Sequence, residues 1–413
     1  MRVLMFGWEL PPHNSGGLGV ACHGLARAFS DSGTDIIFVL PRKIDVPSDL
    51  PYVRFAEGGS LKMKHLDMLL RPYVTSREYE YYRRNIKSDI YGHNLFAEVL
   101  RYAEAAALLA EEEEFDVIHA HDWLSFLAGV RVKLETGKPL VVHVHATGFE
   151  LSGENNVDER IYAIEKEGME EADCVVTVSE RTKNIVTRLY GIDPEKIVVV
   201  HNGIKADEYR VSSQENSMEE KFDSQKPRMP FVRAGQKVVL YAGRLTLHKG
   251  PDLFLRAARR VLDYEPDTLF IVAGSGDMEG QIIRQSAALG IADHVFFAGF
   301  ARGEELNKLY YAADLYVLPS VAEPFGMTPL ESLVNGTPVL ISKQAGVSEA
   351  LSHALKADFW DVDEMSNKII MALRYPILAK QLAKYGYLEA IALTWQKAAE
   401  KCKTVYNKLV HKD

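Results

Sequence analysis

Two cations follow an apolar run in the second half of the chain, at a place where they could act on a ligand. Arg244 and Lys249 lie in the stretch AGRLTLHKG, directly after the run VVLYA, which predicts a strand. Open α/β sheets bind ligands at the carboxyl ends of their strands. Two cations there could stabilise a leaving diphosphate as its negative charge grows. Solvated loop charges are the alternative, but the neighbouring Gly243 and Gly250 favour the functional interpretation.

Two carboxylates flank a second loop of the same kind. Glu323 and Glu331 bracket EPFGMTPLE, just after the predicted strand LYVLPS. The residues that follow the loop look helical, which places Glu331 about one turn into the helix and Glu323 in the loop. The backbone N–H groups of Gly326, Met327 and Thr328 would form the open N-terminus of this helix, a place that binds phosphate. Two carboxylates eight residues apart are common, but their placement around a glycine-containing loop after a buried strand is not.

A glycine-rich loop follows the first predicted strand. Gly16, Gly17 and Gly19 of GGLG precede an apolar-periodic helix, so their N–H groups could bind phosphate at the helix N-terminus. A plain tight turn is the alternative. The spacing is not that of the dinucleotide fingerprint, and the GSG at 274–276 has no third glycine, so a nicotinamide cofactor is disfavoured.

Four histidines alternate on two further predicted strands. His119 and His121 belong to HAHDW, and His143 and His145 belong to VVHVHAT. Alternation places both members of a pair on one face of a strand, as a metal site needs, and Asp122 could be a further ligand. No downstream His, Asp or Glu set keeps metal-ligand spacing, so a catalytic metal is not expected. His145, nearest the carboxyl end of its strand, is predicted to contact substrate, and the others to hydrogen-bond within the core.

An Asp-Val-Asp triplet near the C-terminus looks like the DxD metal motif of another class of transferase. It follows no apolar strand and precedes the helical pattern EMSNKIIMALRY. We therefore interpret Asp363 as the N-cap of that helix instead of a metal ligand.

These residues need a scaffold of parallel strands, and the sequence predicts one. Short apolar runs alternate with helical patterns, which is typical of a parallel sheet wrapped by helices. Continuous runs such as VVHVH and FIVAG fit strands buried on both faces. The fold class is therefore α/β. Strands are predicted at 2–6, 35–40, 117–120, 140–145, 174–178, 197–201, 237–242, 268–273, 294–298, 315–318 and 338–341.

The strands fall into two groups, which predicts two Rossmann-like, doubly wound domains in series. We place an N-terminal domain at 1–203, a polar linker or insertion at 204–236, and a C-terminal domain at 237–390. A final helix at 391–413 is expected to pack back onto the first domain. The Tyr- and Arg-rich stretch 52–91 lacks a clear period and is predicted to be a functional loop.

Composition and charge limit the class of protein. The 413 residues carry a formal net charge of -9, which argues against a general nucleic-acid or anionic-membrane binder. Cys22, Cys174 and Cys402 are too few and too scattered for a disulfide framework or a zinc module. The short apolar N-terminus fits no signal peptide, and no run approaches the roughly 18 apolar residues of a membrane span. We expect a cytoplasmic protein, with peripheral membrane contact left open.

The motifs occur together in an order that resembles a known family. GWELPPHNSGGLG, HAHDW, VVHVHAT, VVHNGI, AGRLTLHKG and EPFGMTPLE follow one another as in the retaining GT-B glycosyltransferases, and the resemblance covers nearly the whole chain. Glycosyltransferase family 4 and the glycogen and starch synthases are the most similar groups. The resemblance implies a GT-B fold, in which two Rossmann-like domains face each other across a cleft that holds the active site.

The resemblance also implies a role for each candidate residue. The three glycines of GGLG approach the donor phosphates. Arg244 and Lys249 bind the diphosphate, and Glu331 holds the donor ribose. His145 contacts the transferred sugar, and Glu323 touches its hydroxyl groups.

One departure separates the chain from the bacterial glycogen and starch synthases. Those enzymes carry KTGGLG and lack the second Glu of the motif that EPFGMTPLE matches. This chain has Asn14 and Ser15 in place of Lys-Thr and retains Glu331, which favours family 4 and leaves both UDP and ADP open as donor nucleotide. Asp122 stands where the synthases place an acidic residue near the sugar. The stretch SDIYGHNLFAEVLRYAEAA nevertheless resembles glucan synthases.

The expected reaction is transfer of a hexose, with glucose as the first choice, from a UDP- or ADP-sugar to an acceptor hydroxyl with retention. Protein cations would stabilise the leaving diphosphate, so no metal or other cofactor is expected. An α-glucan is the first choice of product, and a lipid, polysaccharide or small-sugar acceptor is the alternative. A non-catalytic glycan-binding protein is the alternative from a different class. A nicotinamide-dependent oxidoreductase would need the missing fingerprint.

Overall fold

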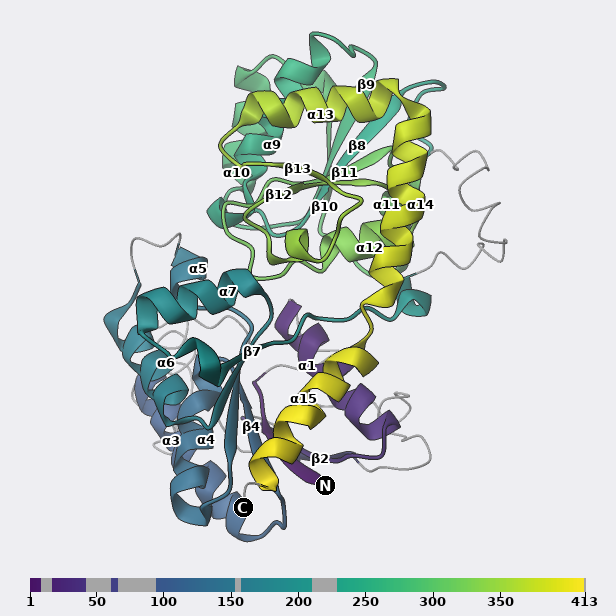
Figure 1. Cartoon of the computed structure of the whole chain (residues 1–413). Helices are drawn as coiled ribbons and strands as arrows, with labels where there is room; N and C mark the ends of the chain where they lie inside the picture. The colour runs from purple at the N-terminus through teal and green to yellow at the C-terminus, as the bar shows by residue number, and fades with distance from the viewer. Residues whose placement is uncertain (9–16, 42–60, 66–93, 153–156, 210–228, 412–413) are drawn as a thin grey trace. The chain divides into compact units, whose positions relative to one another are not determined.

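The computed structural model of the chain describes all residues except 9–16, 42–60, 66–93, 153–156, 210–228 and 412–413. Contacts between Cα atoms divide the chain into two units. The first is Met1–Phe149, Glu154–Gly203 and Thr394–Asp413, and the second is Glu150–Gly153 and Ile204–Leu393. Apart from the short segment Glu150–Gly153, the chain leaves the first unit after Gly203 and returns to it after Leu393 (Figure 1).

The first unit is built on a seven-stranded parallel sheet with the order β3-β2-β1-β4-β5-β6-β7. In this doubly wound order the chain starts at the centre of the sheet and winds outward in both directions. The strands are β1 (Arg2–Phe6), β2 (Asp35–Leu40), β3 (Leu61–His65), β4 (Val117–His121), β5 (Leu140–Val144), β6 (Cys174–Thr177) and β7 (Ile197–Val199). The helices are α1 (Gly17–Asp31), α3 (Leu95–Glu111), α4 (Trp123–Thr136), α6 (Glu159–Glu171), α7 (Glu180–Ile185), the π-helix η2 (Val186–Tyr190), η3 (Pro194–Lys196) and α15 (Trp395–Val410). The short helix α5 (Gly148–Ser152) begins in this unit and ends in the segment Glu150–Gly153 of the second unit.

The central strands of this sheet are buried on both faces, as their apolar runs predict. Every residue of β4 and β5 is buried, including the three histidines on these strands. Local signals set the ends of the covering helices. The Asn94 side chain accepts from Ala97 N at 2.9 Å at the start of α3. Helix α4 ends at Gly137, whose φ of 66° is the left-handed conformation that glycine adopts without strain.

The C-terminal helix α15 packs against α1 within the first unit. A Cβ added at Gly24 of α1 would come within 2.3 Å of the Trp395 ring. A Cβ added at Gly203 would come within 2.1 Å of the Trp395 backbone nitrogen. Because both approaches leave no room for a side chain, we infer that these glycines are required for the seating of α15.

The second unit contains a six-stranded parallel sheet with the order β10-β9-β8-β11-β12-β13. The strands are β8 (Lys237–Ala242), β9 (Thr268–Ala273), β10 (Val295–Gly299), β11 (Leu315–Leu318), β12 (Val339–Ser342) and β13 (Leu355–Ala357). The α-helices are α9 (Pro251–Leu262), α10 (Glu279–Ala288), α11 (Glu304–Ala312), α12 (Thr328–Val334), α13 (Val362–Arg374) and α14 (Pro376–Ala392). The short 3-10 helices are η4 (Ala206–Tyr209), η5 (Leu247–Lys249), η6 (Ala292–His294) and η7 (Gly346–Glu349).

One apolar core supports the loops at the carboxyl edge of this sheet. Phe254 of α9 packs edge-on against Phe270 of β9, with ring centroids 5.7 Å apart. Val317 of β11 and Ile369 of α13 are fully buried in the same core. The strand ends that carry the candidate residues are therefore held on a close-packed base.

The α/β fold class is confirmed, and each predicted strand is present with ends that differ by no more than two residues. Two strands, β3 and β13, were not predicted. The interpretation of Asp363 as an N-cap is wrong: Asp361 is the N-cap of α13, and its side chain accepts from Glu364 N at 2.8 Å. Asp363 lies in the first turn and pairs with Arg260. Within the described residues, we find no helix that is both long and apolar enough to cross a bilayer. The stretch 52–91 lies outside the described residues apart from β3.

Candidate active site

The loops after β8 and β9 contact each other backbone to backbone. Gly243 N donates to the Ala273 carbonyl oxygen at 3.0 Å. Gly274 has a φ of 145°, and a Cβ there would come within 1.9 Å of the Gly243 carbonyl oxygen. The glycines at 274–276 are therefore explained by close loop packing. This contact fixes the backbone of the loop 243–250, which carries the two candidate cations.

Lys249 and Glu323 form an ion pair between the loops that follow β8 and β11. Their side chains are 19% and 9% exposed, so water screens the pair only weakly. Gly250 turns the chain with a φ of 65°, and a Cβ there would come within 2.3 Å of the Pro319 carbonyl oxygen. The two loops are thus in close contact. The structure brings together a cation and a carboxylate that come from two different motifs.

Arg244 lies half-buried in the same loop as Lys249. The Tyr241 hydroxyl donates to the Arg244 carbonyl oxygen at 2.8 Å, which fixes the backbone at this cation. His248, which the sequence analysis missed, lies between them in the chain. Burial, together with the nearby charges of Lys249 and Arg244, lowers the pKa of His248 to about 4. The imidazole is therefore neutral at neutral pH. Its position between two cations was the available signal in the sequence.

Backbone bonds to the loop after β12 fix the loop that carries Glu323. Glu323 and Ala345 form an isolated parallel bridge. Gly346 N donates to the Glu323 carbonyl oxygen at 2.9 Å, and Val347 N donates to the Phe325 carbonyl oxygen at 2.7 Å. The backbone that carries the Glu323 carboxylate is thus fixed on both sides of Pro324.

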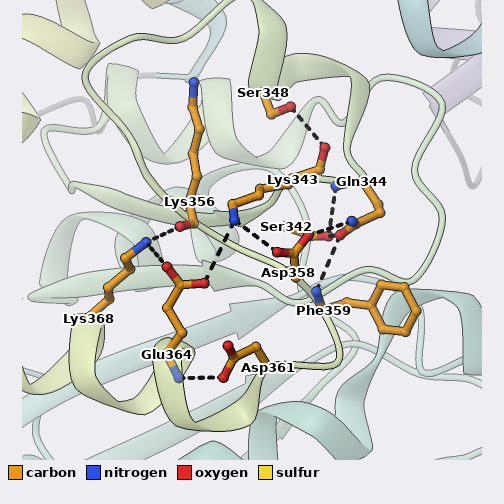
Figure 2. Close-up of polar contacts among 10 residues, drawn as sticks. All are labelled: Ser342, Lys343, Gln344, Ser348, Lys356, Asp358, Phe359, Asp361, Glu364 and Lys368. Atoms are coloured by element: carbon orange, nitrogen blue, oxygen red, sulfur yellow. Dashed lines mark hydrogen bonds and ion pairs between the residues drawn. The ribbon is translucent and has the colours of Figure 1, made fainter.

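A surface network in turn anchors the loop after β12 (Figure 2). Lys343 pairs with Asp358 at 2.8 Å, and Gln344 Nε2 donates to the same carboxylate at 2.9 Å. Lys343 Nζ also lies 3.9 Å from Glu364 in the first turn of α13, the helix that Asp361 caps. Exposed pairs of this kind contribute little to stability, because water screens them. Their effect is to connect the loop after β12 to β13 and α13.

Helix α12 begins at Thr328 with an open N-terminus. Gly326 turns the chain with a φ of 104° ahead of the N-cap residue, Met327. Among the described residues no side chain caps the helix at Met327, so the first N–H groups are oriented outward from the helix end. An end of this kind is what phosphate binding at Gly326, Met327 and Thr328 would require.

Glu331 lies in the first turn of α12, as predicted from the helical pattern that follows the loop. The hydroxyl of Tyr310, on α11, donates to Glu331 Oε2 at 3.0 Å. Burial raises the pKa of Glu331 to about 7, and the hydrogen bond from Tyr310 acts in the opposite direction. The sequence analysis did not single out Tyr310, because an aromatic residue on an amphipathic helix is most simply interpreted as part of the hydrophobic core.

In the first unit, Asp122 occupies a strained position directly after β4. Its φ is 57° and its ψ is 169°, and it is the one non-glycine residue with positive φ in the described part of the chain. Such conformations persist only where surrounding bonds enforce them. Asp122 Oδ1 accepts from His145 N at 2.7 Å, and Asp122 N donates to the His143 carbonyl oxygen at 3.0 Å. Asp122 therefore orients the backbone of His145, the candidate for substrate contact.

The four histidines of β4, β5 and the residue after β5 form one cluster of ring contacts. His143 and His145 stack with ring centroids 4.2 Å apart, and His119 and His121 with centroids 4.3 Å apart. His121 Nδ1 lies 2.8 Å from His145 Nε2, and His119 Nδ1 bonds the Tyr406 hydroxyl. Burial lowers the pKa of all four, to about 3 for His119 and His145. The cluster is therefore neutral at neutral pH.

The ring nitrogens of His119, His121 and His143 lie within 4.8 Å of one another. The rings of His119 and His143 are nearly parallel, with an interplanar angle of 8°, whereas the rings of His121 and His145 are tilted by 31°. The in-plane lone pairs of parallel rings run side by side, whereas a metal requires them to converge on one point. The same distance limit holds for Cys22 with His121 and His145. The absence of a catalytic metal stays a prediction.

Of the GGLG loop, Gly17 and Gly19 are described, and Gly16 lies outside the described residues. Gly17 is the first residue of α1, and Gly19 is buried in its first turn. A Cβ at Gly17 would meet no described atom within 4 Å. Packing therefore gives no reason for glycine at this position.

A doubly wound parallel sheet in each of two units, with the candidate residues at strand ends, is the architecture of the GT-B fold. The chain belongs to the glycosyltransferases. The model of Glycosyltransferase Family 4 matches residues 15–208, and the model of Glycosyl transferases group 1 matches residues 223–389. The protein is therefore an enzyme that transfers a sugar.

Three curated relatives are similar over most of the chain. The uncharacterized glycosyltransferase MJ1607 of Methanocaldococcus jannaschii is 32% identical over 86% of this chain and 83% of its own length. Glycogen synthase of Mycobacterium tuberculosis is 28% identical over 85% of this chain and 80% of its own length. D-inositol 3-phosphate glycosyltransferase of Corynebacterium diphtheriae is 28% identical over 71% of this chain and 70% of its own length.

Solved structures share the fold at lower identity. Sucrose-phosphate synthase of Thermosynechococcus elongatus superposes with a TM-score of 0.77 at 19% identity, covering 100% of both chains. HepE of Anabaena, solved with UDP-glucose, has a TM-score of 0.71 at 18% identity, covering 98% of this chain and 100% of its own. Starch synthase IV of Arabidopsis thaliana, solved with ADP and acarbose, has a TM-score of 0.69 at 17% identity, covering 100% and 99%.

Proposed function

We propose that the enzyme transfers a hexose, with glucose as the first choice, from a UDP- or ADP-sugar to an acceptor hydroxyl with retention at the anomeric carbon. The observation that carries this proposal is the Lys249–Glu323 pair beside Arg244, at the carboxyl edge of the second sheet. In a nucleotide-sugar site the two cations bind the diphosphate. The Glu323 carboxylate accepts hydrogen bonds from the hydroxyl groups of the transferred sugar.

The proposed transition state separates charge, positive on the sugar and negative on the leaving diphosphate. Arg244, Lys249 and the open N-terminus of α12 stabilise the negative part, and limited exposure strengthens the interaction. Before the donor binds, Glu323 compensates the charge of Lys249, which limits the penalty of holding that ammonium group out of water. Because these protein groups supply the charge stabilisation, the proposed step requires no divalent metal.

Retention follows if the acceptor attacks from the face that the diphosphate leaves. The bond from the anomeric carbon to the phosphate oxygen breaks as the bond to the acceptor oxygen forms. The acceptor proton passes to an oxygen of the leaving diphosphate, so no protein nucleophile is needed. The enzyme then acts by positioning the reactants and by stabilising charge.

We assign the remaining candidates to the same reaction. Glu331 accepts from the ribose hydroxyl groups of the donor, and His145 contacts the transferred sugar. Asp122 acts on the sugar through the backbone of His145, to which it is bonded. The glycines of the GGLG loop approach the donor phosphates.

One structural neighbour supports a nucleotide-glucose donor, and a second supports ADP as the donor nucleotide. HepE was solved with UDP-glucose and starch synthase IV with ADP, so both nucleotides remain in the proposal. For the acceptor, similarity to a glycogen synthase supports an α-glucan. Several relatives of 27–28% identity are named D-inositol 3-phosphate glycosyltransferases, which supports a small phosphorylated acceptor as the second candidate.

A screen of donors and acceptors tests this proposal. The enzyme is incubated with UDP-glucose or ADP-glucose and with glycogen, D-inositol 3-phosphate or no acceptor, and released UDP or ADP is measured. We expect release that depends on the acceptor and is greatest with glycogen. Release only with D-inositol 3-phosphate would select the second candidate. If no hexose donor gives acceptor-dependent release, the proposed reaction is wrong.

A further inference from the structure

Tyr310 makes a buried contact that the proposed reaction does not yet use. Its side chain is fully buried on α11. Its hydroxyl lies 3.0 Å from Glu331 Oε2. A buried tyrosine hydroxyl needs a hydrogen-bond partner, and here that partner is the carboxylate assigned to the donor ribose.

The bond occupies one oxygen of the Glu331 carboxylate and fixes its orientation. Within the described residues, no protein group donates to the other oxygen, Oε1. A carboxylate held at one oxygen presents the second in a defined direction and gives up less side-chain entropy when a ligand binds. A glutamate without such a partner would sample several rotamers.

A second tyrosine fixes the turn on which Glu331 is carried. The Tyr316 hydroxyl lies 2.7 Å from Thr328 Oγ1 and donates to the Ala242 carbonyl oxygen at 3.1 Å. The rings of Tyr310 and Tyr316 meet edge to face with centroids 5.6 Å apart. Strand β11 and helix α11 thus each hold one residue of the first turn of α12, and Tyr310 is the one that reaches the carboxylate.

We propose that Tyr310 is a positioning residue for the nucleotide sugar: its hydroxyl holds the Glu331 carboxylate in the orientation that receives the donor ribose. The inference rests on the proposed role of Glu331. It adds a residue that touches no substrate and acts through the carboxylate.

The same bond affects the protonation of Glu331. The titratable groups that interact with this carboxylate are Tyr310 from α11, Tyr316 from β11 and Tyr209 from η4. Burial raises the pKa of all three tyrosines, so they stay protonated at neutral pH. The Tyr310 bond lowers the pKa of Glu331, so its removal should raise that pKa and shift the protonation of the carboxylate to higher pH.

Tyr310→Phe tests the proposal, because it removes the hydroxyl and keeps the ring. We expect the donor KM to rise roughly 10-fold, typical of losing a hydrogen bond to a charged group, with kcat changed less than about twofold. The affinity for UDP or ADP alone, measured by calorimetry, should fall by a similar factor. The pH below which donor binding weakens should move upward relative to the unchanged enzyme.

Tyr311→Phe is the matched control, since Tyr311 is the next residue of α11 and points about 100° away around the helix. It should leave the donor KM and the pH profile unchanged. The double variant Tyr310→Phe with Glu331→Gln should bind the donor no more weakly than Glu331→Gln alone. Tyr310 is proposed to act only through the Glu331 carboxylate, so its change adds nothing once that carboxylate is removed.

The outcomes separate this inference from the assignment on which it rests. If Glu331→Gln raises the donor KM but Tyr310→Phe lowers only the melting temperature, Tyr310 is merely structural and the inference is overturned. If Glu331→Gln itself leaves donor binding unchanged, the ribose assignment fails and the inference fails with it. If Tyr310→Phe lowers kcat and leaves the donor KM unchanged, the positioning role is also contradicted.

Discussion

Acid is expected to destabilise the first unit, because four neutral histidines are buried in its core. The pKa values of His119, His121, His143 and His145 all lie below the ordinary value of 6.5, mainly through burial. Unfolding exposes these side chains to water, where they take up protons once the pH falls below 6.5. The unfolded chain then binds more protons than the folded chain, so stability decreases as the pH decreases.

The magnitude follows from the two histidines whose pKa falls to about 3, His119 and His145. Between the ordinary pKa of 6.5 and a pKa of about 3, each removes about 1.4 kcal/mol of stability per pH unit. At pH 5 this amounts to about 2 kcal/mol for each histidine and about 4 kcal/mol for the pair. His121 and His143 act in the same direction. Domains are stable by about 5–15 kcal/mol, so a large share of the stability is lost.

Urea unfolding followed by tryptophan fluorescence measures this loss. Trp8, Trp123 and Trp395 belong to the first unit and Trp360 belongs to the second, so the signal reports mainly on the first unit. We expect the urea midpoint to be nearly constant above about pH 7.5 and to fall steadily between about pH 6.5 and 5. The fold should recover when the pH is raised again.

Two variants separate proton uptake from ordinary destabilisation. His143→Phe removes one titrating group from the cluster and should reduce the slope of stability against pH. Val142→Ala, at the neighbouring buried position of β5, removes apolar contacts and should lower stability by the same amount at every pH. A urea midpoint that does not change between pH 8 and 5, or an unchanged slope in His143→Phe, would refute this account of the cluster.

Three further predictions concern the reaction. Lys249→Met and Arg244→Met should each reduce turnover by about 10²-fold or more with the fold retained, as expected when one donor to a developing anion is lost; near-normal turnover in either variant would remove that residue from the mechanism. Activity should survive EDTA, because protein cations stabilise the leaving diphosphate. If EDTA abolishes activity and zinc or manganese restores it, the hypothesis of a catalytic metal is favoured instead. Glu331→Gln should raise the donor KM by an amount equivalent to about 1–3 kcal/mol, whereas Glu323→Gln should mainly lower kcat. Equal effects of the two changes on kcat would contradict the separate roles.

The sequence predicted the central strands because these are buried on both faces and therefore have continuous apolar runs. The two strands that it missed, β3 and β13, lie at sheet edges. Their sequences, LKMKH and LKA, carry lysines and are short or alternating. An edge strand needs less apolar surface, so pairing with its neighbour determines it more than composition does. The N-cap at Asp361 was missed because either aspartate of the Asp-Val-Asp triplet can cap a helix. The conformation of the backbone decides which of the two does so.

The candidate site was predictable in part. Arg244, Lys249 and Glu323 were recognisable as loop residues, since each lies in a glycine-containing loop that follows an apolar run. The topology of a parallel sheet places such loops at one edge of the sheet. The ion pair between Lys249 and Glu323 depends on the close approach of two loops, which no local pattern reports. The contact of Tyr310 with Glu331 depends on how α11 packs beside α12. Contacts of this kind between distant segments arise only from packing.

The most direct test of the proposed reaction is the anomeric configuration of the first product. Proton NMR spectra recorded during turnover of UDP-glucose or ADP-glucose with the accepted acceptor distinguish α from β linkages by the coupling of the anomeric proton. We predict an α-linked product from the α-linked donor, formed together with one equivalent of UDP or ADP. A β-linked product, or glucose released to water without transfer, would contradict retaining glycosyl transfer.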